Sequence, residues 1–193
     1  DIAQCLVGSE MCIRDSFLDS IYPQYLIKEN SSVLDIGAGA GFPSLPLKIY
    51  RPDLKITMID SLNKRVNFLN EMIAFLNLKD ISATHTRAED FALKNRERFD
   101  YVIVRAVAKL NTLVEYALPF LKLHGELLAY KGAEVEEEIL QCESALKILG
   151  GKIECVEKFE LEGNSRSIVV IKKISQTPEK YPRGKNLPKL KPL

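Results

Sequence analysis

Apolar residues along the chain follow two spacings, which predict two kinds of element. Short apolar runs predict strands at Ser32–Ile36, Lys55–Asp60, Ile81–Thr86, Tyr101–Val104 and Gly125–Tyr130. Between them a period near 3.6 predicts helices at Ser61–Leu76, Leu110–Leu121 and Val135–Leu149, another that begins near Pro43, and an amphipathic piece from Phe17 to near Lys28. Strands that alternate with helices are typical of a doubly wound parallel sheet.

The end of the chain has a different pattern. Lys152–Leu161 and Ser165–Ile174 read as strands around a Gly163-Asn164 turn, which predicts an antiparallel hairpin. The sequence therefore predicts an α/β fold, with a doubly wound, mostly parallel seven-stranded sheet of Rossmann-like type and a C-terminal antiparallel hairpin. Ligands of such sheets bind beyond the carboxyl ends of the strands, so the residues that follow each strand are candidates for a site.

Charge is unevenly distributed along the 193 residues. The net charge is only +1, but residues 172–193 hold seven basic residues and one acidic residue, so this end carries +6 and the rest about −5. A basic tail indicates a polyanionic partner, and a solvated flexible terminus is the alternative. No apolar run approaches the roughly 18 residues that span a membrane. The four cysteines and two histidines show no metal-ligand spacing, so we expect a cytoplasmic protein without metal or membrane.

The first sixteen residues do not share the pattern of the rest. They show neither a helical nor a strand period, and the string from Cys5 to Asp15 resembles a translated sequencing adapter. We therefore interpret residues 1–16 as a non-native segment that replaces a lost N-terminal region. The expected organisation is this segment, one α/β domain at 17–174 and a basic tail at 175–193.

A glycine turn follows the first predicted strand and carries the strongest functional signal. Gly37, Gly39 and Gly41 stand at alternate positions, where glycine allows positive φ and close approach of a ligand to the backbone. A dinucleotide-binding G-x-G-x-x-G motif would need a third glycine where Phe42 stands. The spacing fits S-adenosylmethionine (SAM) better than a nicotinamide dinucleotide, and Phe42 could pack on the ligand or in the core.

Two acidic residues accompany the glycine turn. Asp35 ends the first strand, where it could fix loop amides, contact the amino group of the ligand, or cap the turn. Asp60 ends the second strand, where its carboxylate could accept hydrogen bonds from both ribose hydroxyls or cap the following helix.

The later strands end on further candidates. Ala88 and Glu89 follow the third strand, where contacts to an adenine edge would arise, although Glu89 could also cap a helix. Arg105 follows the fourth strand and could bind the cofactor carboxylate or the substrate backbone, or form a structural salt bridge. Lys131 ends the fifth strand and is expected at the mouth of the cleft.

Taken together, these motifs resemble one bacterial enzyme family, the 16S rRNA guanine-N7 methyltransferases called RsmG or GidB. The resemblance is carried by Phe-Leu-Asp-Ser (17–20), Asp-Ile-Gly-Ala-Gly-Ala-Gly-Phe-Pro (35–43), Asp-Ser-Leu-x-Lys-Arg (60–65), Arg-Ala-Glu (87–89), Arg-Ala-Val-Ala-x-Leu (105–110), Lys-Gly (131–132), Arg-x-Ile-Val-Val-Ile-Lys-Lys (166–173) and Thr-Pro-x-Lys-Tyr-Pro-Arg (177–183). It implies a class I methyltransferase fold, SAM as cofactor, and cofactor contacts at Gly37, Phe42, Ala88, Glu89 and Arg105.

The implied reaction needs little acid–base chemistry from the chain. Guanine N7 attacks with a free lone pair, so we identify no catalytic base and expect Arg105 and Lys131 to orient the substrate. The implied partner is 16S rRNA or an assembly intermediate of the small ribosomal subunit, bound by a monomer, with tail contacts from Lys180, Tyr181, Arg183 and Lys185. Tyr181 could stack on a base, although packing on the domain is the favoured alternative. A SAM-dependent methyltransferase of another substrate and a non-catalytic RNA-binding protein remain alternatives.

Overall fold

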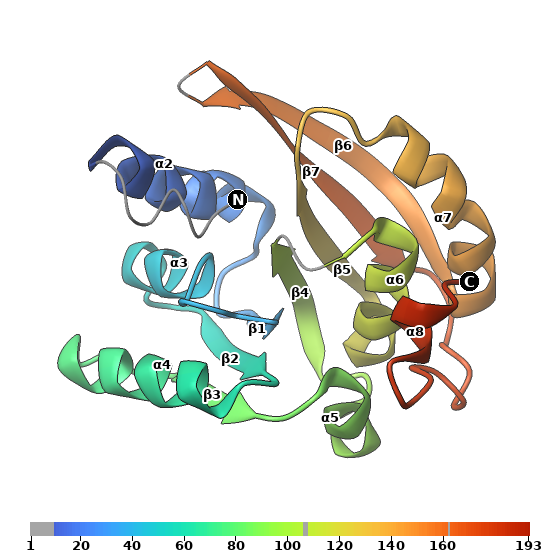
Figure 1. Cartoon of the computed structure of the whole chain (residues 1–193), viewed down its shortest axis with the longest axis horizontal. Helices are drawn as coiled ribbons and strands as arrows, with labels where there is room; N and C mark the ends of the chain where they lie inside the picture. The colour runs from blue at the N-terminus through green and yellow to red at the C-terminus, as the bar shows by residue number, and fades with distance from the viewer. Residues whose placement is uncertain (1–9, 106–107, 162) are drawn as a thin grey trace.

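A seven-stranded sheet forms the centre of the computed structural model, which describes residues 10–105, 108–161 and 163–193, the side chains of residues 10–13 excepted (Figure 1). Its strands are β1 (Ser32–Ile36), β2 (Lys55–Asp60), β3 (Ile81–His85), β4 (Phe99–Arg105), β5 (Leu121–Lys131), β6 (Gly151–Leu161) and β7 (Asn164–Lys173). They lie in the order β3-β2-β1-β4-β5-β7-β6. The first five strands are parallel to one another, and β7 pairs antiparallel with both β5 and β6. The predicted fold class is confirmed.

Helices cover both faces of this sheet. They are α2 (Glu10–Ile21), α3 (Ser44–Tyr50), α4 (Asn63–Phe75), α5 (Ala88–Asn95), α6 (Leu110–Ala117), α7 (Glu136–Leu149) and α8 (Leu187–Leu190), with 3-10 turns η1 (Tyr22–Leu26) and η2 (Leu118–Phe120). In Figure 1, α2, α3 and α4 lie to one side, and α5 to α8 lie to the other. None of the helices in the described ranges is long and apolar enough to cross a membrane.

Two hydrophobic cores follow from the alternation of side chains along the strands. In β4, Val102 and Val104 point into one core with α5, α6 and α7, whereas Tyr101 and Ile103 point into the other with α3 and α4. Strands that are buried on both faces have continuous apolar sequences, and this pattern allowed their positions to be predicted.

Three elements differ from the sequence expectation. The predicted helix 110–121 ends at Ala117, because Pro119 turns the chain through η2, and β5 begins at Leu121. Helix α5 was not predicted. At the amino end, α2 runs without a break across residue 16, the expected boundary of the non-native segment, while residues 1–9 of that segment lie outside the described residues.

The C-terminal tail packs against the domain. Tyr181 is only 5% exposed and belongs to the core beside α6 and α7. Arg96, which follows α5, donates hydrogen bonds to the carbonyl oxygens of Tyr181 and Thr177. The tail is therefore a structural part of this face of the molecule.

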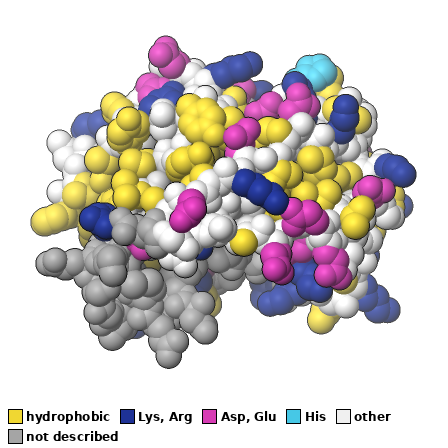
Figure 2. All heavy atoms as spheres, turned by 90° about the horizontal axis from the view of Figure 1, so that it is seen from above, with side chains coloured by type: hydrophobic (Ala, Val, Ile, Leu, Met, Phe, Trp, Pro, Cys, Tyr) yellow, Lys and Arg dark blue, Asp and Glu magenta, His cyan; other side chains and the backbone are white. Residues whose placement is uncertain are grey.

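The outer surface mixes charges of both signs with apolar side chains. Figure 2 shows basic and acidic side chains interspersed on one face, between clusters of apolar residues.

Candidate functional site

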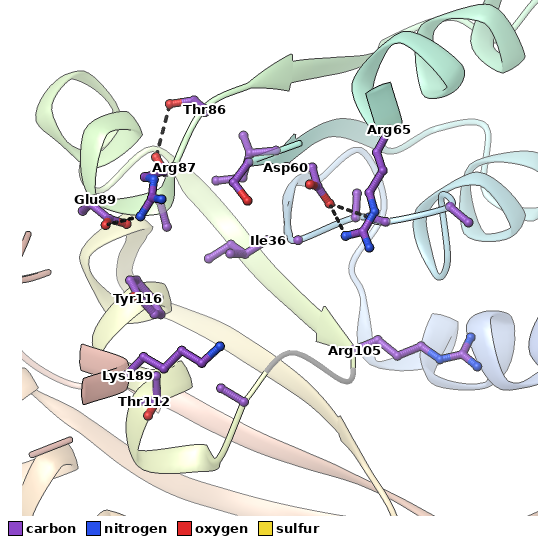
Figure 3. Close-up of a pocket in the computed structure, with 18 of the residues that line it drawn as sticks. Ile36, Asp60, Arg65, Thr86, Arg87, Glu89, Arg105, Thr112, Tyr116 and Lys189 are labelled. Carbon is purple, nitrogen blue, oxygen red and sulfur yellow. Dashed lines mark hydrogen bonds and ion pairs between the residues drawn. The ribbon is translucent and has the colours of Figure 1, made fainter. Parts of the chain in front are cut away.

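A cavity of about 830 Å³ opens at the carboxyl ends of β1, β2 and β4, where the strand order reverses (Figure 3). Ligands of open α/β sheets bind at this switch point. Of the predicted site residues, the cavity lining includes Gly37, Gly39, Phe42, Asp60, Ala88, Glu89 and Arg105. The topology thus collects residues from four separate motifs into one site.

The glycine turn forms the floor of this cavity. Gly37, Gly39 and Gly41 have φ values of 76°, 58° and 94°, in the left-handed region that favours glycine. The Gly37 amide donates to the Ile59 carbonyl at 2.8 Å, which fastens the turn to the end of β2. A side chain at Gly39 would meet only the Gly37 carbonyl, at 3.8 Å, so a ligand can lie against this backbone.

Gly41 has a packing role in addition to the cofactor contact predicted for it. It does not line the cavity, and a Cβ there would collide with Leu45 of α3 and lie 3.0 Å from Leu69 of α4. Gly41 therefore lets the turn pack against the two helices, and its contact with the cofactor stays a prediction.

Asp60 connects the glycine turn to helix α4. Its side chain is nearly buried, with Oδ2 accepting the Gly39 amide at 3.0 Å and Oδ1 accepting the Leu62 amide at 2.9 Å. The capping alternative is thus observed, because Leu62 is the N-cap of α4. Asp60 also lines the cavity, and its Oδ2 pairs with Arg65 Nη1 at 3.5 Å. Its Oδ1 retains a further lone pair for a ligand hydroxyl.

Asp35 lies behind the glycine turn and does not line the cavity. Its Oδ2 accepts a hydrogen bond from the Ser44 hydroxyl at 2.6 Å, and its Oδ1 has no partner among the described residues. Burial raises the pKa of Asp35 to about 7, although the hydrogen bond from Ser44 lowers it. The carboxyl group therefore fixes the start of α3.

Ala88 and Glu89 begin helix α5 at the far side of the cavity from Arg105. The Glu89 Oε1 atom is buried and accepts no hydrogen bond from a described residue, while the Arg87 Nη1 atom stands 3.8 Å from it. A buried acceptor without a donor is costly, so this oxygen is well suited to receive an N–H group of a ligand.

Arg105 lines the cavity, but its guanidinium points toward helix α2 (Figure 3). It forms an ion pair with Asp19 at 3.3 Å and donates to the Ser16 carbonyl at 3.3 Å. Its guanidinium carbon stands 5.9 Å from the centre of the Phe42 ring, which packs edge-on against Phe17. The salt-bridge alternative is observed, and it explains why Phe-Leu-Asp-Ser accompanies the arginine.

Lys131 is not among the residues that line the cavity, and its role in orienting the substrate stays a prediction. Its Nζ atom donates to Glu138 Oε2 at 2.6 Å and to the Ala108 carbonyl at 2.8 Å. Glu138 also accepts the Leu110 amide at 2.8 Å. Lys131 thus ties the chain after β4 to the first turn of α7.

The tail residues divide into two groups. Tyr181 is buried, so the packing alternative is observed, and Arg183 forms an ion pair with Glu115 at 2.6 Å. Lys180 and Lys185 are exposed. Asn186 and Lys189 of the tail also line the cavity. The sequence did not reveal this contact. The apolar residues of the tail were the available signal that it docks.

Comparison with known proteins gives one family. The family model described as rRNA small subunit methyltransferase G matches residues 8–169. The chain is similar to proteins named Ribosomal RNA small subunit methyltransferase G from Desulforamulus reducens (52% identity, 84% of this chain, 70% of that protein) and Alkaliphilus metalliredigens (48%, 92% and 77%). The protein of that name from Clostridium botulinum is 45% identical over 97% of this chain and 81% of its own length.

Solved structures support the fold. P. horikoshii TYW2, in complex with MeSAdo, superposes with a TM-score of 0.68 at 18% identity and covers 86% of this chain and 64% of its own. M. jannaschii TYW2, in complex with AdoMet, gives a TM-score of 0.67 at 20% identity over 86% and 77%.

Proposed function

Because this chain belongs to the rRNA small subunit methyltransferase G family, we propose that it transfers the methyl group of SAM to N7 of a guanine in 16S rRNA. The observation that carries the proposal is the cavity itself. It combines the open backbone at Gly37 and Gly39 with the carboxylates of Asp60 and Glu89, at the reversal of strand order in a chain that resembles these relatives over most of its length.

The residues of the cavity fit the cofactor. The Gly39 backbone offers close approach for the methionine part, and Asp60 Oδ1 has a spare lone pair for a ribose hydroxyl. Glu89 Oε1, which accepts no hydrogen bond from a described residue, suits an amino group of the adenine. The bound cofactor supplies a methyl group on a positively charged sulfur. Phe42 and Arg105 close the end of the cavity next to α2.

The chain has to align the reactants rather than move a proton. Guanine N7 holds a lone pair in the plane of the ring, and it can attack the methyl carbon without losing a proton first. Alignment of two reactants can supply roughly 7–11 kcal/mol of a barrier. Arg105, with Asp19 holding it, is suited to orient the guanosine or the cofactor carboxylate.

The RNA partner we propose is 16S rRNA, either free or in an assembling small subunit, bound in the cytoplasm by a monomer. The exposed ammonium groups of Lys180 and Lys185 lie on the docked tail, and Lys189 extends into the cavity itself. Contacts of this kind to phosphates make affinity depend on salt.

The test is methylation of small-subunit rRNA and of assembly intermediates by the purified chain with SAM, followed by mapping of N7-methylguanine. Methylation of one guanine, lost on substitution of Asp60, supports the proposal. Transfer of methyl only to another class of substrate would contradict the RNA assignment. RNA binding with no measurable SAM binding would leave a non-catalytic RNA-binding protein.

A further inference from the structure

A hydrogen bond between two side chains joins the docked tail to the edge of the cofactor cavity. Arg87 Nη1 donates to Asn186 Oδ1 at 3.1 Å, which joins residues 99 positions apart in the chain. Asn186 has a φ of 56° and directly precedes α8. The tail is fastened on both sides of it, by Arg183 to Glu115 and by the Thr112 hydroxyl, which donates to the Pro188 carbonyl at 3.2 Å.

Arg87 is shared between the tail and Glu89. Its Nη1 atom lies 3.1 Å from Asn186 Oδ1 but 3.8 Å from Glu89 Oε1. An unrestrained arginine closes on a carboxylate to about 2.7–2.9 Å, often with two parallel hydrogen bonds. The separation of 3.8 Å therefore leaves Glu89 Oε1 buried and without a hydrogen-bond donor among the described residues.

We infer that Asn186 is a positioning residue of the cofactor site, which holds Arg87 away from Glu89 and so keeps Glu89 Oε1 free to accept an N–H of the adenine. The inference rests on the proposed function, because it presumes SAM in this cavity. Without Asn186, Arg87 would close on Glu89, and the adenine would have to displace it. The tail is thus part of the small-molecule site as well as a candidate RNA contact.

The direct test is calorimetric titration of SAM, without RNA, into wild type and Asn186→Gly. Glycine keeps the left-handed backbone and removes only the amide. We expect the dissociation constant for SAM to rise about three- to tenfold, the scale of one lost hydrogen bond, with little change in the unfolding midpoint. Asn186→Asp also tolerates this backbone and keeps the acceptor, so it should retain SAM affinity.

Further variants test whether Asn186 affects SAM affinity through Arg87. If Asn186 acts through Arg87, Asn186→Gly should have no additional effect on SAM affinity in an Arg87→Met background. Asn77→Gly is the matched control, because Asn77 has a φ of 51° and is exposed at the end of α4, outside the cavity lining. It should leave SAM affinity unchanged.

The outcomes separate this inference from the proposed function. Failure of the wild-type chain to bind SAM would overturn both. Normal SAM affinity in Asn186→Gly would overturn the inference alone. An equal loss of affinity with and without Arg87 would also overturn it, because Asn186 would then act by another route.

Discussion

At the scale of single residues, the carboxylate of Asp60 both holds the backbone of the glycine turn and faces the cavity. It accepts the amides of Gly39 and Leu62, and it lines the cavity. Asp60→Asn replaces one acceptor oxygen with a donor that must face a backbone N–H. A hydrogen bond to a charged group contributes about 1.5–3 kcal/mol, so we expect SAM affinity to fall about ten- to hundredfold in calorimetry.

A matched control for Asp60 lies elsewhere in the chain. Asp53 also accepts a backbone amide, from Asn30 at 2.9 Å, and also pairs with an arginine, Arg51 at 2.8 Å, but it is outside the cavity lining. Asp53→Asn should leave SAM affinity at the wild-type value. Equal affinities for SAM in the Asp60 and Asp53 variants would remove Asp60 from the site.

Gly41 offers a prediction about stability. Gly41→Ala places a Cβ against Leu45 and Leu69 at a φ of 94°, so both overpacking and backbone strain apply. We expect the free energy of unfolding in urea to fall by about 2–4 kcal/mol. Gly163→Ala is the control, because Gly163 has a φ of 74° and no described atom within 4 Å of an added Cβ. A loss as large in Gly163→Ala would show that backbone strain alone is responsible.

At the scale of elements, the tail is held by an ion pair with a fully buried partner. The Glu115 side chain is 0% exposed, and Arg183 contacts it through its amide, Nε and Nη2 atoms. Arg183→Met leaves this carboxylate without its cation, and we expect a loss of about 3 kcal/mol in urea unfolding. The double variant Arg183→Met/Glu115→Gln should recover part of that loss. No recovery would mean that the pair contributes through packing alone.

The exposed tail lysines lead to a different expectation. Lys180→Ala and Lys185→Ala should leave stability unchanged and weaken RNA binding. Each lost phosphate contact lowers the slope of log K against log salt by about 0.7 for single-stranded RNA. Lys147→Ala on the exposed face of α7 is the control and should leave the slope unchanged. Unchanged slopes for both tail variants would show that these lysines do not contact RNA.

The sequence predicts best those elements whose structure depends on residues close together in the chain. The strands and the glycine turn are set by local composition, so β1, β2 and the positive φ values at Gly37, Gly39 and Gly41 could be read directly. The pairing of Lys131 with Glu138 and of Arg183 with Glu115 depends on which elements meet in space, which local patterns do not encode. The charge of the tail predicted RNA contacts, and its aromatic residue Tyr181 indicated packing on the domain, which the structure shows.

At the scale of the whole molecule, both ends of the described chain meet the same cavity. Ser16 of α2 lines it beside Arg105, and Asn186 and Lys189 of the tail line the other side. The glycine turn after β1 forms the floor of the cavity, and segments distant in sequence line its sides. Cofactor affinity and tail docking are therefore expected to be linked, since a ligand that binds only the folded site stabilises it.

The buried carboxyl group of Asp35 predicts how stability depends on pH. Burial raises its pKa in the folded protein to about 7, against an ordinary value of 3.8. Between these values the unfolded chain binds fewer protons, so the free energy of unfolding falls as pH rises, by at most about 1.4 kcal/mol per pH unit from this group. The stabilising effect is complete below pH 4 and is lost as pH passes through about 7.

Asp35→Asn isolates this contribution, because the amide is neutral at every pH and its oxygen can still accept the hydrogen bond from Ser44. Urea unfolding of both proteins from pH 4 to 8 should show similar stability at pH 4, an advantage for the variant that grows up to about pH 7, and a constant difference above it. Other titrating groups are common to both proteins and cancel in the difference. Parallel curves across this range would mean that Asp35 is ionised throughout, and that Ser44 and the nearby backbone compensate for its burial.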